Sequence, residues 1–208
     1  MNTKTVLFAV CAVLVLASMS KVNADVVSGD HPTFGTDSLT INTTDGMAFL
    51  DLSFTAGMSH DEVSSELGAG GNFEGFRYAS ESEVVDLVIE HGFDHSVSGG
   101  NLLGTPGADQ LSGLVDLLGQ TGLSSDGFTR SSAGITSTSL NAVQQRVVFI
   151  FDQIASDSGD EVGLSTAMRR QDSLDRVGSF LVVVPEPNGI LIVCASLLGT
   201  AARRRRPR

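Results

Sequence analysis

Four acidic residues close together in the sequence offer the ligands that a hard cation binds. They are Asp152, Asp157, Asp160 and Glu161. Carboxylate oxygens are the ligands that Ca²⁺ prefers in proteins. The stretch lacks the spacing and the full ligand set of an EF-hand loop, so an ordinary acidic turn is the alternative. The sequence therefore offers Asp157, Asp160 and Glu161 as calcium candidates, and we predict no other metal or cofactor.

Arg77 and Tyr78 form the second candidate site, in a stretch that we expect to be a short strand. Arg77 lies between Phe76 and Tyr78. A guanidinium group beside aromatic rings could bind a carboxylate or a sugar. The alternative is a structural ion pair with a nearby carboxylate, such as that of Glu81 or Asp51.

Three histidines, His60, His91 and His95, are candidate metal ligands. Zinc ligands must converge at fixed spacing, and Gly92 interrupts any helix between His91 and His95, so solvated or capping histidines are the alternative. The sequence contains no Gly-x-Ser-x-Gly nucleophile motif and no glycine-rich phosphate loop before a basic helix. We therefore predict a protein that is not an enzyme.

The composition restricts the chemistry further. Both cysteines, Cys11 and Cys194, lie in apolar stretches at the two ends of the chain, so residues 25–183 have no disulfide and no thiolate site. The net charge of the whole chain is −11. Residues 25–184 keep only six basic residues against 23 acidic ones, a net charge of −17. Clustered basic residues are needed to bind phosphates, so we expect no nucleic-acid partner.

The first 24 residues have the features of a secretory signal peptide. Lys4 precedes an uncharged apolar run over residues 6–17, and small residues occupy the −3 and −1 positions of a cleavage site after Ala24. Cleavage there would make Asp25 the new N-terminus. An uncleaved signal anchor is the alternative, although the run is short for one.

The last 25 residues combine three features. Val184, Pro185, Glu186 and Pro187 form a rigid extended segment, because proline prevents a helix from continuing through it. An uncharged apolar run follows over residues 189–202, about 20 Å long as a helix, which is short for a bilayer core of about 30 Å. A basic cluster then keeps the end of the chain cytoplasmic. The cluster contains Arg203, Arg204, Arg205 and Arg206.

This order of Pro-Glu-Pro, apolar segment and arginine cluster resembles the PEP-CTERM sorting signal of exported bacterial proteins. The resemblance implies recognition and cleavage by exosortase, a membrane-embedded protease, after export through the secretion translocon and cleavage by signal peptidase. It implies that the protein is held transiently at the inner membrane and then passes to the cell surface or to an exopolysaccharide matrix. An uncleaved tail anchor is the alternative, with the same orientation.

Between the two ends, over residues 25–183, we expect one α+β domain with a small mixed or antiparallel sheet and about three short helices. The expected strands are 38–41, 48–54, 73–79, 142–154, 163–168 and 178–184. Ser59 with Glu62 and Ser80 with Glu83 predict capping boxes that begin two helices, and the apolar spacing predicts a third helix over 108–118. We expect loops over 94–108 and 119–139, which are rich in glycine and small polar residues.

Part of this domain has a second resemblance. Phe49-Leu50-Asp51-Leu52, a helix, and Gly75-Phe76-Arg77-Tyr78-Ala79 before another helix resemble a module that recurs in PEP-CTERM proteins and is similar to C-type-lectin-like domains. The resemblance implies a compact domain with helices on a small sheet, and no particular activity. Our expectation is an exported cell-surface or matrix protein with a structural or interaction role. A lectin-like module that binds carbohydrate or another small ligand is the alternative, and a secreted hydrolase is the second alternative.

Overall fold

The computed structural model describes residues 26–105, 109–154 and 159–184. The predictions for the signal peptide and its cleavage between Ala24 and Asp25, for Asp157, and for the tail from Pro185 onward lie outside these residues. None of the helices formed by the described residues is long and apolar enough to span a bilayer.

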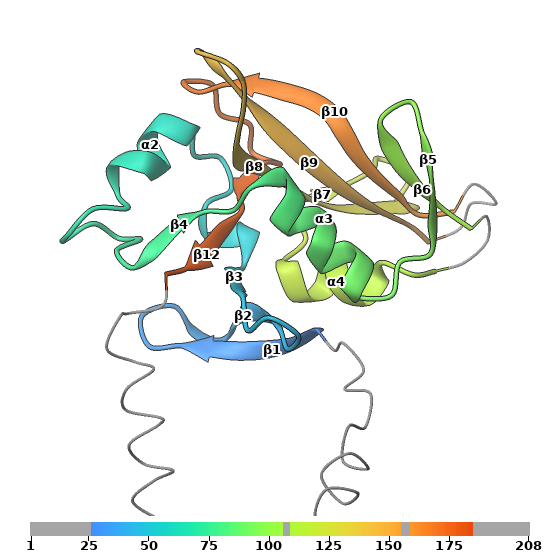
Figure 1. Cartoon of the computed structure of the whole chain (residues 1–208), viewed down its shortest axis with the longest axis horizontal. Helices are drawn as coiled ribbons and strands as arrows, with labels where there is room; N and C mark the ends of the chain where they lie inside the picture. The colour runs from blue at the N-terminus through green and yellow to red at the C-terminus, as the bar shows by residue number, and fades with distance from the viewer. Residues whose placement is uncertain (1–25, 106–108, 155–158, 185–208) are drawn as a thin grey trace, which may run out of the picture.

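The described residues form a mixed α+β structure, as the sequence predicts, but the strands make two sheets instead of one small sheet (Figure 1). The first sheet has the strand order β1-β2-β3-β12-β4, and each neighbouring pair in it is antiparallel. Its strands are β1 (Val26–His31), β2 (Gly35–Asn42), β3 (Ala48–Leu50), β12 (Leu181–Val183) and β4 (Phe76–Tyr78).

The second sheet has the order β11-β8-β9-β10-β6-β5, with β7 paired to β8. Only the pairing of β11 with β8 is parallel among the described strands. Its strands are β5 (His95–Ser98), β6 (Asn101–Gly104), β7 (Gly122–Leu123), β8 (Thr129–Asn141), β9 (Gln144–Gln153), β10 (Glu161–Arg169) and β11 (Gly178–Ser179). The central position of β9 confirms the strand expected over residues 142–154. Val147, Val148 and Ile150 of its apolar run are buried, whereas Phe149 and Phe151 are partly buried.

Three α-helices and one short 3₁₀ helix complete the described elements. They are η1 (Leu52–Phe54), α2 (His60–Ser65), α3 (Glu81–Glu90) and α4 (Ser112–Leu118). Both predicted capping boxes are confirmed, at Ser59 with Glu62 and at Ser80 with Glu83. The expected strand 48–54 is wrong beyond Leu50, because the Asp51 side chain accepts a hydrogen bond from Ser53 N (2.8 Å) and turns the chain into η1.

Two predicted loops are strands instead. Residues 94–108 contain the β5–β6 hairpin, whose turn residues Gly99 and Gly100 have φ of 60° and 85°, as a tight two-residue hairpin turn requires. Most of residues 119–139 belong to β7 and β8. Serine and threonine do not prevent a buried strand here, because Ser132 Oγ donates to Gly119 O (2.8 Å) and Thr136 Oγ1 donates to Arg146 O (3.2 Å).

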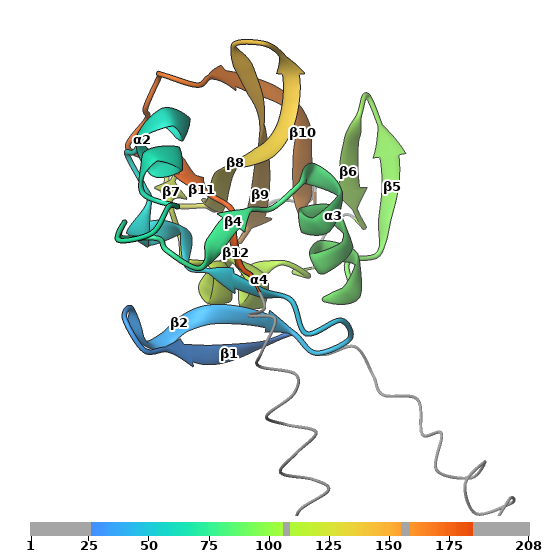
Figure 2. The ribbon, with the colours of Figure 1, turned by 60° about the vertical axis from the view of Figure 1, so that its left-hand side comes forward.

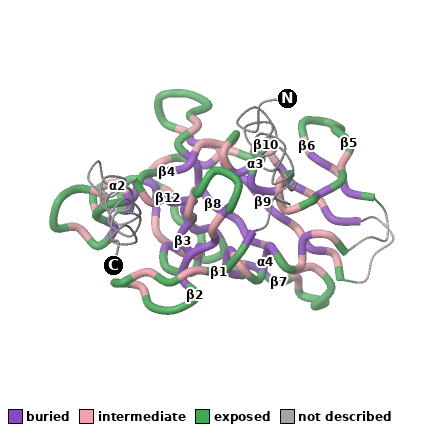
Figure 3. Tube along the Cα trace, turned by 60° about the horizontal axis from the view of Figure 1, so that its bottom comes forward, coloured by how far each residue is buried: buried purple, intermediate pink, exposed green. Residues whose placement is uncertain are grey.

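The two sheets enclose α3 and α4 in a shared core. The helix α4 lies between the β1–β2 hairpin of the first sheet and strands β8 and β9 of the second (Figure 2). Buried segments gather in the middle of the molecule, and exposed loops surround them (Figure 3). The core side chains from both sheets and both helices include Phe49, Val84, Leu87, Leu114, Leu118, Val148, Ile150 and Phe180, each fully buried.

The last described strand segment joins the two sheets. The expected strand 178–184 divides into β11, in the second sheet, and β12, in the first. Phe180 lies between them: its N–H donates to Ile135 O (2.9 Å), and its carbonyl accepts from Ala79 N (2.8 Å). Gly134 makes room for the ring, because a Cβ there would lie 2.6 Å from Phe180 Cδ2.

Candidate functional site

Three carboxylates from separate parts of the chain converge at one end of the second sheet. One oxygen each of Asp109, Asp152 and Asp160 lies within 4.8 Å of the others. Asp152 is near the end of β9, Asp160 directly precedes β10, and Asp109 precedes α4. The antiparallel pairing of β9 with β10 brings Asp152 and Asp160 together, and the packing of α4 adds Asp109.

Asp160 is buried and fixes the backbone around the cluster. Its Oδ2 accepts hydrogen bonds from the N–H groups of Gln110 and Leu111, both at 2.7 Å, and its Oδ1 accepts from Gln153 N at 3.0 Å. Leu111, at the N-cap position of α4, makes no side-chain capping hydrogen bond to the helix. Asp160 therefore fixes the segment that leads into α4 and holds the end of β9 beside it.

Asp152 is fully buried on the core-facing side of β9. Its Oδ2 accepts hydrogen bonds from Arg130, at 2.8 Å from Nε, and Arg130 also reaches Asp116 Oδ1 at 2.7 Å. Asp152 Oδ1 is buried and has no hydrogen-bond partner within the described ranges. Burial raises the pKa of Asp152, the neighbouring Asp109 and Asp160 raise it further, and the hydrogen bonds and charge of Arg130 oppose the rise.

This cluster could bind a cation. Three carboxylates face one another, and a single arginine touches one of them. Like charges so close together repel one another, and a proton or a cation between them relieves this repulsion. Because the three ligands are all oxygen, they suit a hard cation such as Ca²⁺ better than Zn²⁺, which prefers histidine nitrogen and cysteine sulfur.

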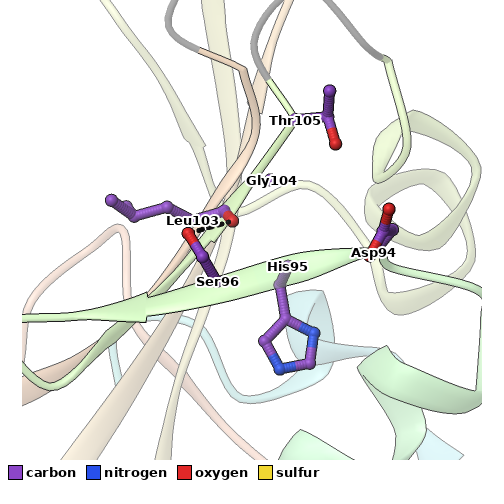
Figure 4. A pocket seen from close by; sticks show the side chains of 6 residues that line it. All are labelled: Asp94, His95, Ser96, Leu103, Gly104 and Thr105. Atoms are coloured by element: carbon purple, nitrogen blue, oxygen red, sulfur yellow. Dashed lines mark hydrogen bonds between the residues drawn. The ribbon is translucent and has the colours of Figure 1, made fainter.

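A shallow pocket of about 260 Å³ is lined by Asp94, Thr105 and residues of β5 and β6, and not by the three aspartates. It is connected to the cluster through Gly104, whose N–H donates to Asp160 O at 2.8 Å. A Cβ at Gly104 would lie 2.8 Å from the Phe93 ring, so glycine is needed for this close approach. Figure 4 shows the side chains of Asp94, His95 and Thr105 pointing in different directions, so these three groups do not converge on one reacting atom.

A second hollow of about 260 Å³ lies over β7, β8 and β9. The rings of Phe149 and Phe151 stack there, with centroids 5.6 Å apart, and Arg176 lies beside them. Ser124, Thr129 and Ser131, which carry hydroxyl groups, also line it, together with Gly122 and Leu123. The hollow therefore offers aromatic rings, a cation and hydrogen-bonding groups in one place.

Of the calcium candidates from the sequence, the structure places Asp160 in the cluster and Glu161 outside it. Asp152 and Asp160 do meet. Glu161 lies outside the group of three and instead accepts a hydrogen bond from Asn101 Nδ2 at 2.9 Å, and Asp157 lies outside the described residues. Sequence reasoning missed Asp109, because it is more than 40 positions from its partners and has no local motif. The position of Asp152 could have indicated a buried site. This carboxylate follows Val148 and Ile150 at alternate positions of the same strand, so it lies on their buried face.

Arg77 and Tyr78 do not share a site. They are neighbours in β4, so their side chains lie on opposite faces, with Arg77 exposed and Tyr78 buried. Arg77 forms a two-point ion pair with Glu83 (2.6 and 2.9 Å), so the partner is neither Glu81 nor Asp51. Tyr78 stacks on the His60 ring and donates to the His60 carbonyl at 3.2 Å. Burial raises the pKa of Tyr78 to about 12.

The histidines occupy unrelated places. His60 is buried in α2, and burial lowers its pKa although the hydrogen bond to Asp61 opposes this. His91 ends α3, and His95 stacks on Phe93 at the start of β5. Among the described residues, the three aspartates are the one group of three or more potential metal ligands found close together.

Comparisons of the chain with protein-family models, with curated proteins and with solved structures found no match. Its function is therefore inferred from its own residues.

Proposed function

We propose that this chain is an exported protein, sorted through its C-terminal tail to the cell surface or an exopolysaccharide matrix, where it has a structural or interaction role. One observation carries the proposal: Pro185-Glu186-Pro187, an apolar run and four consecutive arginines follow one another at one end of a chain that begins with a signal-peptide pattern. Each part has a physical role in membrane sorting. The arginines stay cytoplasmic, so residues 25–184 face the other side.

The partners follow from this route. The secretion translocon and signal peptidase act at the first end, and an exosortase-type protease acts at the Pro-Glu-Pro segment while the apolar run is in the inner membrane. Proline on both sides of Glu186 favours an extended segment on sequence grounds, which is the form that proteases bind.

Two features of the described domain support this proposal. The domain contains no cysteine among its described residues and is held together by its two-sheet core, so its folding does not depend on disulfide formation during export. Its last strand, β12, ends at Val183, and the N–H of Val184 donates to Gly75 O at 2.8 Å. The described structure therefore includes the residue that precedes Pro185, and cleavage beyond this point would remove no strand of either sheet.

The proposal is tested by changing the tail and following the protein in its own host. Combining Pro185→Ala, Glu186→Ala and Pro187→Ala should leave the protein in the inner-membrane fraction, whereas the unchanged chain reaches the surface or matrix fraction. Asn188→Ala is the matched control and should sort normally. Equal distribution of the triple variant and the unchanged chain would contradict the proposal.

A second candidate function is supported by the hollow over β7, β8 and β9. Stacked phenylalanine rings beside Arg176 and several residues with hydroxyl groups are suited to a carbohydrate or another small ligand. A glycan array probed with and without calcium tests it. Selective binding that is lost in Phe151→Ala, but kept in the exposed Phe128→Ala, would support this function. Absence of selective binding would contradict it.

A further inference from the structure

We propose that Asp109, Asp152 and Asp160 bind a hard divalent cation, Ca²⁺, which joins the end of β9, the start of β10 and the N-terminus of α4. The observation that points to a bound cation is the unpaired state of Asp152 Oδ1. The Asp152 side chain has no solvent exposure, and no described residue donates a hydrogen bond to this oxygen. A buried carboxylate oxygen without a partner is costly, and a cation between the three carboxylates would give it one.

The charges around the cluster are suited to a divalent ion. Three carboxylates carry three negative charges, and Arg130 supplies one positive charge through Asp152 Oδ2. Arg130 is also shared with Asp116, an exposed carboxylate outside the cluster. If Arg130 is counted wholly with the cluster, these three negative charges and one positive charge give a net charge of −2, which one divalent cation would balance, and Asp116 makes the surroundings still more negative.

The spacing of the oxygens agrees with calcium coordination. Oxygen ligands lie about 2.3–2.6 Å from Ca²⁺, so two ligands on opposite sides of one ion are about 5 Å apart. The three oxygens here lie within 4.8 Å of one another. They can therefore share one ion with little movement. Three protein carboxylates leave coordination positions for water and carbonyl oxygens, as in calcium sites of modest affinity.

The hydrogen bonds around the cluster hold its carboxylates in place. Gln110 N and Leu111 N fix Asp160 Oδ2, Gln153 N fixes Asp160 Oδ1, and Arg130 fixes Asp152 Oδ2. Among the described residues, Asp160 Oδ1 accepts only from Gln153 N and keeps a second lone pair for a metal, and Asp152 Oδ1 keeps both of its lone pairs. Such outer partners orient the ligands of metal sites in general. Asp109 is exposed and provides a route for the ion from solvent.

The test uses full-length protein, treated with EDTA and then dialysed, with CaCl₂ as the probe. Thermal unfolding in 10 mM CaCl₂ should occur about 3 to 10 °C higher than in NaCl of equal ionic strength, for a dissociation constant of about 0.1–1 mM. Titration calorimetry should show one ion per chain. The NaCl comparison separates binding from general screening of this acidic protein.

Asp109→Asn is the decisive variant, because Asp109 is exposed and its loss leaves the hydrogen bonds of Asp152 and Asp160 in place. We expect its calcium affinity to fall at least tenfold and most of the thermal shift to disappear. Asp152→Asn should have the same effect on binding. Asp86→Asn, which removes an exposed carboxylate from α3, is the matched control and should keep the full shift. No saturable shift in the unchanged protein, or an equal shift in Asp109→Asn, would overturn the proposal.

Discussion

Two arginine–carboxylate pairs in this protein show how burial decides the pKa of a carboxyl group. Hydrogen bonds from Arg77 hold the pKa of Glu83 well below its usual range, at about 2. Asp152 also pairs with an arginine, but the effect of burial on its pKa is larger than that of the arginine, so the pKa of Asp152 rises. The difference follows from the surroundings: Glu83 is partly exposed and also accepts from Ser80 N, whereas Asp152 is fully buried beside two other carboxylates.

The low pKa of Glu83 predicts a pH-dependent contribution to stability. Because the pKa is lower in the folded protein than in the unfolded chain, the contribution is complete above about pH 4.5 and is lost as the pH falls towards 2. Glu83→Gln should lower the free energy of unfolding by about 1 kcal/mol at pH 7, since the Arg77 side chain is 47% exposed and solvent screens the pair. Glutamine can still close the capping box.

Denaturant unfolding at several pH values measures this effect. The difference between Glu83→Gln and the unchanged protein should stay constant between pH 5 and 8 and disappear near pH 2. Glu74→Gln, at an exposed position, serves as the control for loss of charge. A difference that persists at pH 2 would show that the ion pair is not its cause.

At the level of single residues, the sequence predicts local contacts and misses distant ones. The capping boxes of Ser59 and Ser80 depend on residues three positions apart, so their pattern is visible in the sequence. The partner of Arg77 is also local, but several carboxylates were near enough to compete for it. Asp109 joins Asp152 and Asp160 only because two strands pair and a helix packs against them, and no local pattern reports that.

Among the elements, the strand β8 shows why amino-acid composition alone can predict a loop where the chain forms a strand. Its serine, threonine and glycine residues are typical of loops, yet residues 132–136 are buried. The hydroxyl groups of Ser132 and Thr136 satisfy backbone carbonyls, and Gly134 admits the Phe180 ring. The helix α3 was predictable for the opposite reason, since its apolar residues recur at helical spacing between a capping serine and a glycine.

Gly134 supplies a test at this level. In Gly134→Ala the new Cβ would lie 2.6 Å from Phe180 Cδ2 and 2.9 Å from Leu52 Cδ2, so the core must shift. We expect a loss of about 1–3 kcal/mol in the free energy of unfolding, measured with denaturant. Gly68→Ala, where a Cβ meets no atom within 4 Å, should change it by less than about 0.5 kcal/mol. Equal effects would mean that β8 and Phe180 do not pack in this way.

At the scale of the whole molecule, the last strands, β11 and β12, connect the two sheets. The segment from Val177 to Val183 pairs with β8 in the second sheet and with β3 and β4 in the first. Phe180 is fully buried where the segment passes from one sheet to the other. The two sheets should therefore unfold together.

Phe180→Ala tests this coupling. Removing a fully buried phenylalanine should cost about 3–5 kcal/mol, and unfolding should remain a single transition. Circular dichroism and the accessibility of a reporter cysteine at Val147→Cys, in the second sheet, should then change at the same denaturant concentration. Phe128→Ala, at a position 55% exposed, should have little effect. Separate transitions would show that the sheets are independent.

The central claim concerns the fate of the whole chain, and the mass of the mature protein from its native host tests it most directly. If the chain is exported and sorted through its tail, the mature species should lack residues 1–24 and also lack Arg203, Arg204, Arg205 and Arg206, with its new C-terminus near Pro185. A mature species that keeps the arginine cluster in cells with active exosortase would contradict the claim.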